Sequence, residues 1–227
     1  LSGNIPKKVE VDAKAPIRSS TQIERRINEL SLSIEDRSAL IDISGMTHLW
    51  ALTCIHSCIK NGLRTSVIYT EARSYFPKKS SQNELLQAWK LKEYDKAAEF
   101  LQSAGLKEVQ IVPDFAGNFR PGAKTCLIIF VGYEPNRIQG LVDLYAPSAI
   151  IVYYGKSPHP NLEWRTSLSR ALHQDIFEQW LTRSNETSTL SVDNILTTLE
   201  NEFKVIHREY DIAIAPQCGK MQGLAAY

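Results

Sequence analysis

The clearest pattern in the chain is a pair of continuous apolar runs, TCLIIFV at 125–131 and AIIVYY at 149–154. A strand with one solvent-exposed face alternates apolar and polar residues. A continuous apolar run instead predicts a strand buried on both faces, as in a parallel sheet covered by helices. A helical pattern at 136–145 separates the two runs. We therefore predict that residues 127–131 and 150–153 are core strands, each buried on both faces.

The same alternation of strand and helix patterns extends over most of the chain. Further strands are expected at 39–43, 65–70, 108–113 and 211–215, and further helices at 21–30, 47–60, 82–104, 162–180 and 192–207. Residues 182–190 are rich in Ser and Thr and are interpreted as a linker. The first strand, helix and strand form a βαβ unit, which favours parallel strands joined by a right-handed connection. Six strands separated largely by helices predict an α/β fold with a doubly wound, mainly parallel, Rossmann-like sheet in three α/β/α layers.

The length of 227 residues fits one large α/β domain. Residues 1–20 are polar, include two prolines and show no clear period, so we expect an N-terminal arm there. Residues 21–227 are expected to form a single Rossmann-like domain. Because the sequence ends just inside an expected final helix, we also expect this domain to be truncated at its C-terminus.

Composition narrows the classes of protein. Hydrophobic residues make up 43% of the chain and charged residues 22%, which is enough for a sizeable core and excludes global disorder. The net charge of +1 gives no electrostatic basis for binding duplex nucleic acid or an anionic membrane. No apolar run reaches the roughly 18 residues that span a bilayer, and no signal peptide opens the chain. The four cysteines lie in or beside apolar segments, which is typical of free thiols in a reducing compartment, so a cytoplasmic location is expected.

Candidate chemistry gathers in the turns that follow the expected strands. Ligands of open α/β sheets bind beyond the carboxyl ends of the strands, where glycines let the backbone approach and basic side chains neutralise phosphates. Tyr75, Tyr133 and Tyr154 are placed to stack on a base. If all strands are parallel, five turns share one edge, and their candidate ligand-binding residues are Ser44, Gly45, Thr47, Arg73, Gly132, Glu134, Arg137, Lys156, Gly219 and Lys220.

Other motifs give weaker evidence of function. Cys54, His56 and Cys58 resemble a metal cluster, but on a helix His56 points away from the other two and no second ligand pair follows, so we predict no metal there. Glu134 and Asp42 are acid/base candidates without a spacing that identifies a pair. The sequence contains no Gly-x-Ser-x-Gly elbow, Walker lysine or Gly-x-Gly-x-x-Gly, which disfavours hydrolases, P-loop NTPases and standard dehydrogenases. We expect no cofactor.

The last 17 residues, DIAIAPQCGKMQGLAAY at 211–227, resemble the signature turn of CRISPR-associated Rossmann-fold (CARF) nucleotide-sensing domains. In that family a strand ends in Gly-Gly-Thr-Lys, and a helix opens with Met, Leu and Ala residues. Lys220 matches the family lysine, and residues 223–226 match the small-residue start of the helix. The chain departs from the family at 217–219, where Gln-Cys-Gly replaces Gly-Gly-Thr, and Met221 stands one position early.

This resemblance implies a domain that binds cyclic or linear oligonucleotide messengers, commonly as a homodimer, and controls a fused effector in bacterial defence. It also implies that residues 44–47 form the other half of the ligand pocket. Our leading hypothesis is therefore a sensor domain that recognises a nucleotide or other phosphorylated small molecule at the carboxyl edge of the sheet. The first alternative is a phosphodiesterase or nucleotide-processing enzyme on the same edge, using Lys220, Ser44 and Glu134. The second is a structural scaffold without a small-molecule site.

Overall fold

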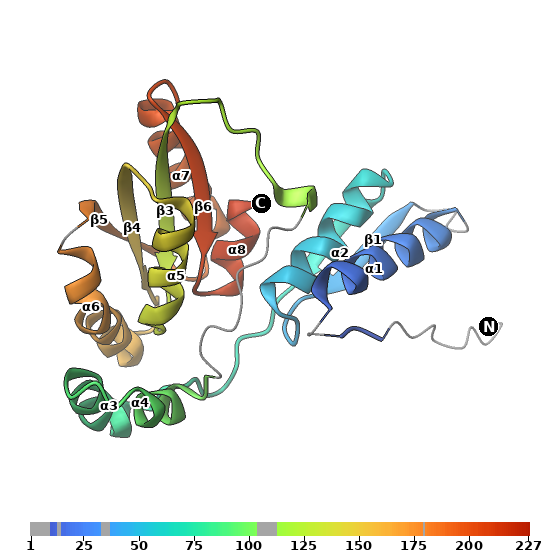
Figure 1. Cartoon of the computed structure of the whole chain (residues 1–227). Coiled ribbons are helices and arrows are strands. Elements are labelled where there is room, and N and C mark those ends of the chain that lie inside the picture. The colour runs from blue at the N-terminus through green and yellow to red at the C-terminus, as the bar shows by residue number, and fades with distance from the viewer. Residues whose placement is uncertain (1–9, 13–14, 33–36, 104–112, 179) are drawn as a thin grey trace. The chain divides into compact units, whose positions relative to one another are not determined.

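The computed structural model describes residues 10–12, 15–32, 37–103, 113–178 and 180–227 (Figure 1). The chain divides into two compact units, Leu1–Ala72 and Arg73–Tyr227. The first unit has a two-stranded sheet and the second a four-stranded sheet. The sequence predicts one domain over 21–227. The structure divides that range after Ala72, because within the described residues the first two strands pair only with each other.

The described residues of the first unit form two helices and two parallel strands. Its elements are α1 (Pro16–Ser31), β1 (Ser38–Asp42), α2 (His48–Lys60) and β2 (Arg64–Ile68), with α1 packed on α2 and α2 packed on both strands. Thr47 caps α2, its hydroxyl oxygen accepting from the Trp50 N–H at 3.5 Å. Gly62 follows the helix with φ +70°, a conformation that favours glycine. The predicted start and end of this helix are confirmed.

Helix α1 begins before the position that the sequence predicts, so the N-terminal arm does not extend to residue 20. Pro16 is the first helical residue. The fixed φ of proline suits a helix, and at this position a backbone N–H would have no acceptor within the helix, so its absence costs no hydrogen bond. Ser19 and Ser20 are buried although they are polar. The Ser19 hydroxyl accepts from the Asp12 N–H at 2.8 Å, and the Ser20 hydroxyl lies 3.5 Å from that of Thr53 on α2. A search for apolar residues at helical spacing does not detect this part of the helix, because its buried residues are serines whose hydroxyl groups have hydrogen-bond partners.

The second unit contains a four-stranded parallel sheet with the strand order β5-β4-β3-β6 (Figure 1). Its strands are β3 (Lys124–Val131), β4 (Ala149–Lys156), β5 (Leu181–Ser188) and β6 (Tyr210–Pro216), and the helices that follow them are α5 (Pro135–Tyr145), α6 (Glu163–Phe177), α7 (Val192–Ile206) and α8 (Lys220–Ala226). The chain moves outward from β3 to β5 and then returns to place β6 on the other side of β3. The topological switch point therefore lies between β3 and β6.

Side chains of the central strands alternate between two apolar layers. Cys126, Ile128 and Phe130 of β3 pack in one cluster with residues of α7 and α8. Leu127 and Ile129 pack in the other cluster with residues of α5 and α6. No residue of 127–131 or 150–153 is more than 3% exposed, so the predicted burial of these strands on both faces is confirmed. Helices on both faces of a parallel sheet make the three-layer, Rossmann-like α/β fold that the sequence predicts.

The segment interpreted as a linker is a strand, β5, so this prediction is wrong. β5 is at the edge of the sheet, where only one side of the strand pairs, with β4. An edge strand keeps polar side chains solvated, and here two of them form ion pairs: Arg183 with Glu202, and Glu186 with Arg170. The run LTRSNETS lacks the apolar pattern of a buried strand because its position does not require one.

The single helix expected at 82–104 is two shorter helices. α3 (Gln82–Lys90) and α4 (Tyr94–Leu101) are separated at Lys92, whose φ of +60° is left-handed and ends the helical path. Leu85 and Ala97 pack with α6 residues in a third apolar cluster, so the break lets both helices reach that layer. Short 3₁₀ turns occur at Lys79–Ser81, Pro113–Phe115 and Pro160–Leu162. Residues 108–112 of the expected third strand lie outside the described residues.

Candidate functional site

The ten candidate ligand-binding residues lie on two different sheets. The turns after β3, β4 and β6 share the carboxyl edge of the four-stranded sheet and carry Gly132, Glu134, Arg137, Lys156, Gly219 and Lys220. Ser44, Gly45 and Thr47 follow β1 in the first unit. There the Ser44 hydroxyl accepts from the Thr70 N–H at 2.8 Å, and Thr47 caps α2. Arg73 is exposed at the beginning of the second unit.

Gly132 lies at the switch point, where its backbone packs against the turn that follows β6. A Cβ atom at position 132 would collide with the carbonyl oxygen of Gln217. The Gln217 N–H donates to the Phe130 carbonyl at 2.9 Å, and the Ser169 hydroxyl of α6 donates to the Gly132 carbonyl at 2.7 Å. Close backbone approach thus explains the glycine at 132.

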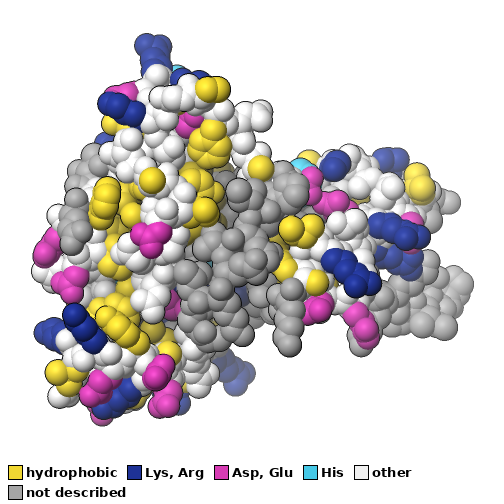
Figure 2. All heavy atoms as spheres, in the orientation of Figure 1, with side chains coloured by type: hydrophobic (Ala, Val, Ile, Leu, Met, Phe, Trp, Pro, Cys, Tyr) yellow, Lys and Arg dark blue, Asp and Glu magenta, His cyan; other side chains and the backbone are white. Residues whose placement is uncertain are grey.

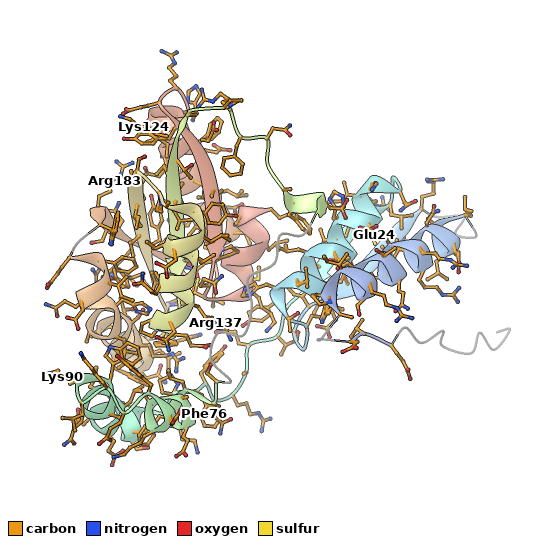
Figure 3. The ribbon with its side chains drawn as sticks, viewed as in Figure 1. Glu24, Phe76, Lys90, Lys124, Arg137 and Arg183 are labelled. Atoms are coloured by element: carbon orange, nitrogen blue, oxygen red, sulfur yellow. The ribbon has the colours of Figure 1, made fainter. Side chains whose placement is uncertain are left out.

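Glu134 and Arg137 interact with each other at the start of α5. Arg137 Nε lies 2.8 Å from the Glu134 carboxylate, which also accepts a short hydrogen bond from the Ser103 hydroxyl beyond α4. Arg137 is labelled in Figure 3, below the sheet in that view. The Glu134 carboxylate is therefore engaged in tying α4 to α5.

Lys156 belongs to a charged group at the end of β4. Its Nζ lies 3.6 Å from the Glu186 carboxylate, which Arg170 also approaches, at 3.0 Å. The Arg170 guanidinium lies 4.3 Å from the centroid of the Tyr154 ring. Burial raises the pKa of Tyr154, and the nearby Arg170 charge partly opposes that rise. Lys156 and Arg170 thus share one carboxylate.

Arg165, near the start of α6, lies among aromatic rings and was not among the residues that the sequence singled out. Its guanidinium carbon is 4.7 Å from the centroid of the Tyr133 ring. The ring centroids of Tyr75 and Trp164 are 5.3 and 5.4 Å from the same carbon. We call these four residues the Arg165 box. Two of the tyrosines proposed to stack on a base, Tyr75 and Tyr133, are brought together here, although they are far apart in sequence.

The donors of Arg165 are directed at backbone carbonyls. Its Nη atoms donate to the Phe76 oxygen at 2.8 Å and the Pro77 oxygen at 3.1 Å. Within the described part of the chain, no carboxylate forms an ion pair with Arg165. Burial raises the pKa of the Tyr133 hydroxyl, and the Arg165 charge opposes that rise. The box therefore holds a cation that neutral oxygens bind and that no carboxylate of the described residues neutralises.

Among the described residues, no three His, Cys, Asp or Glu side chains are grouped to hold a metal ion. Burial raises the pKa of the Cys54 thiol to about 11 and also raises that of Cys58, which favours the protonated thiols. That these cysteines bind no metal stays a prediction. In the part of the chain that the structure describes, no helix has the length and apolarity to cross a bilayer.

Charges of both signs are intermixed on the face of each unit shown in Figure 2. This distribution agrees with the net charge of +1. Comparison with protein-family models, with curated proteins and with solved structures finds no match to this chain. The class of protein is therefore defined by the fold alone: a three-layer α/β protein with a parallel, Rossmann-like sheet.

Proposed function

We propose that the second unit is a sensor domain that binds a nucleotide or other phosphorylated small molecule at the carboxyl edge of its sheet. The observation that carries this proposal is the Arg165 box. A guanidinium is suited to phosphate because its planar donors match two phosphate oxygens, and aromatic rings beside it offer faces on which a base stacks. The edge itself is where ligands of doubly wound sheets bind.

The contrast with other arginines of this unit supports the proposal. Four of them are paired with carboxylates: Arg120 with Asp211, Arg137 with Glu134, Arg170 with Glu186 and Arg183 with Glu202. The Arg165 donors instead meet two neutral carbonyls. A phosphate that replaced these carbonyls would bring a negative charge to the guanidinium and could accept from two of its N–H groups at once.

The contacts of Glu134 favour a domain that binds its ligand over an enzyme that converts it. This carboxylate was the acid/base candidate on the edge, and Ser103 and Arg137 already engage it. The resemblance of residues 211–227 to CARF domains agrees with a sensor. The homodimer and the role in bacterial defence that the resemblance implies are parts of the proposal, as is the cytoplasmic location that the pattern of cysteines indicates.

Thermal-shift measurements with AMP, ADP and cyclic dinucleotides test the proposal. A ligand at about 100 times its dissociation constant stabilises the fold by about 2.7 kcal/mol. In the Arg165→Ala variant we expect the affinity for a bound nucleotide to fall roughly ten- to hundredfold, because a charge-assisted contact contributes about 1.5–3 kcal/mol. Arg165→Lys keeps the positive charge but removes the planar guanidinium, so the affinity lost in this variant measures the contribution of the planar, stacked group. The matched control is Arg208→Ala, at an exposed arginine after α7. Equal losses in the Arg165→Ala and control variants would contradict the assignment.

Lys220, the first residue of α8, gives a second test. If it contacts the phosphate, Lys220→Ala lowers nucleotide affinity roughly ten- to hundredfold while the free energy of unfolding changes by no more than about 0.5 kcal/mol. Lys124→Ala is the control, because Lys124 begins β3 at the opposite edge of the sheet (Figure 3). Isothermal titration gives the affinities and urea denaturation the stabilities. Unchanged affinity removes Lys220 from the site, and a large loss of stability makes it a structural residue.

A further inference from the structure

The side chain of Gln222, in the first turn of α8, is buried where three turns of the carboxyl edge meet. Gln222 is 0% exposed. A Cβ atom at Gly155, near the end of β4, would lie 3.6 Å from Gln222 Nε2 and 2.8 Å from the methyl group of Thr189, after β5. A Cβ atom at Gly219, after β6, would lie 3.4 Å from Gln222 Oε1. We call these four residues the Gln222 niche.

The orientation of the Gln222 amide is fixed by its neighbours. The Gly219 N–H, which can only donate, lies 3.2 Å from Oε1, and the Cys218 thiol donates a short hydrogen bond to the same oxygen. Nε2 is therefore the remaining amide atom, and from the Cβ position of Gly155 it lies at 3.6 Å and Oε1 at 3.8 Å. Nε2 is buried and has no hydrogen-bond partner. Buried amide groups nearly always have partners, so a donor that is held in place without an acceptor requires an explanation.

The residues that surround the Gln222 side chain reach the protein surface. Gly155, Thr189 and Gly219 are each half-buried. The Thr189 N–H is bound to the Lys156 carbonyl at 3.1 Å, which holds the backbone of this turn in place. The Thr189 side chain is held only by a 3.4 Å contact with the same carbonyl. Rotation about its χ1 to another staggered position would move the methyl group away from Gly155.

The surroundings of Nε2 favour a neutral acceptor over an anion. Burial raises the pKa of the adjacent Cys218 thiol, the sign of a poorly hydrated position. Successive β4 side chains alternate between faces, so Lys156 points to the face opposite Gly155, where it approaches Glu186. A charged oxygen taken into such a position loses its hydration, whereas a carbonyl oxygen or ring nitrogen loses much less.

We infer that Gln222 is a recognition residue whose Nε2 donates a hydrogen bond to a neutral acceptor on the base of the ligand, which enters past Thr189. This inference rests on the proposed function and adds that the base, not the phosphate, occupies the Gln222 niche. A side chain at Gly155 or Gly219 would press on Thr189 and the Gln222 amide, so neither position carries one.

The test is isothermal titration with AMP, GMP, CMP, UMP and ribose 5-phosphate, which lacks a base. The wild type is expected to bind at least one nucleotide about tenfold more tightly than ribose 5-phosphate. Gln222→Met, which keeps the length of the side chain, is expected to abolish this difference and leave the affinity for ribose 5-phosphate unchanged. Thr189→Ile, which covers Gly155 without altering Gln222, is expected to do the same, whereas Arg165→Ala weakens the binding of all five probes.

Nuclear magnetic resonance of the wild type keeps the inference testable if Gln222→Met does not fold. The side-chain amide signals of Gln222 are expected to shift on addition of the nucleotide that binds and to stay in place with ribose 5-phosphate. A nucleotide that binds equally well to the wild type and both niche variants, or that leaves these signals unmoved, overturns the inference and leaves the proposed function intact. Failure of all five probes to bind the wild type overturns the inference, and failure of ADP and the cyclic dinucleotides as well overturns the proposed function.

Discussion

An Arg183→Ala variant is expected to lose about 3 kcal/mol of its free energy of unfolding. Arg183 on β5 forms a short ion pair with Glu202 on α7, whose carboxylate also accepts from the Tyr153 hydroxyl at 2.8 Å. The Glu202 side chain is only 11% exposed, so removal of its cation leaves a charge largely out of water. Breaking a buried pair costs about 3–5 kcal/mol, and the lower end applies because Arg183 is itself 41% exposed (Figure 3).

The control for this prediction is Lys156→Ala, on the same sheet. Lys156 and Glu186 are 64% and 38% exposed, and a solvated pair of this kind contributes no more than about 1 kcal/mol. Urea denaturation of both variants measures the difference. An Arg183→Met/Glu202→Leu double variant is expected to recover most of the loss, since it removes both charges together. Equal effects of Arg183→Ala and Lys156→Ala would show that burial of Glu202 contributes nothing.

The second large effect is the dependence of stability on pH that His173 produces. His173 on α6 is fully buried, its Nδ1 lies 2.8 Å from the Ser169 carbonyl, and its Nε2 has no partner. Nδ1 therefore carries the proton and donates. Burial lowers the pKa of the imidazole from 6.5 to about 4. The unfolded chain binds this proton below pH 6.5, and the folded protein binds it only near pH 4.

Stability is therefore expected to be complete above pH 6.5 and to fall as the pH decreases toward 4. The full difference is about 3 kcal/mol, at about 1.4 kcal/mol per pKa unit. His173→Phe removes the titrating group and keeps a ring against Phe177, so its stability should vary less between pH 6.5 and 4. His207 is the matched control, because its ring makes the same contact with a carbonyl four residues earlier and stacks on Phe203, but on the exposed side of α7. If wild type and His173→Phe show parallel pH profiles, the imidazole is not the source.

The local sequence was sufficient to predict an element wherever the burial of that element requires a regular order of apolar residues along the chain. The strands β3 and β4 could be predicted because a strand covered on both faces must be apolar at successive positions. The start and end of α2 could be predicted because Thr47 and Gly62 satisfy helix ends through their own chemistry. The three-layer α/β fold followed from the alternation of these elements, since helices between parallel strands must cover both faces.

Several features depended on neighbours distant in sequence, and no local pattern reveals such neighbours. β5 is a strand because β4 offers it hydrogen bonds, and as an edge strand it keeps polar side chains that resemble a linker. The candidate turns were correctly placed after strands, but the pairing of β1 with β2 means that two of those turns follow strands of a separate sheet.

The sequence by itself determined the class of fold and the edge on which to look for a ligand, because both follow from the periodicity of apolar residues and the order of elements. Only the tertiary structure decided which side chains meet there. Arg165 is one of many arginines in the sequence, and Tyr75 and Tyr133 reach it only after α6 packs on β4 and the segment at 75–77 lies beside it. The Gln222 amide likewise lacks an acceptor because three turns enclose it, and that enclosure exists only once the sheet has formed.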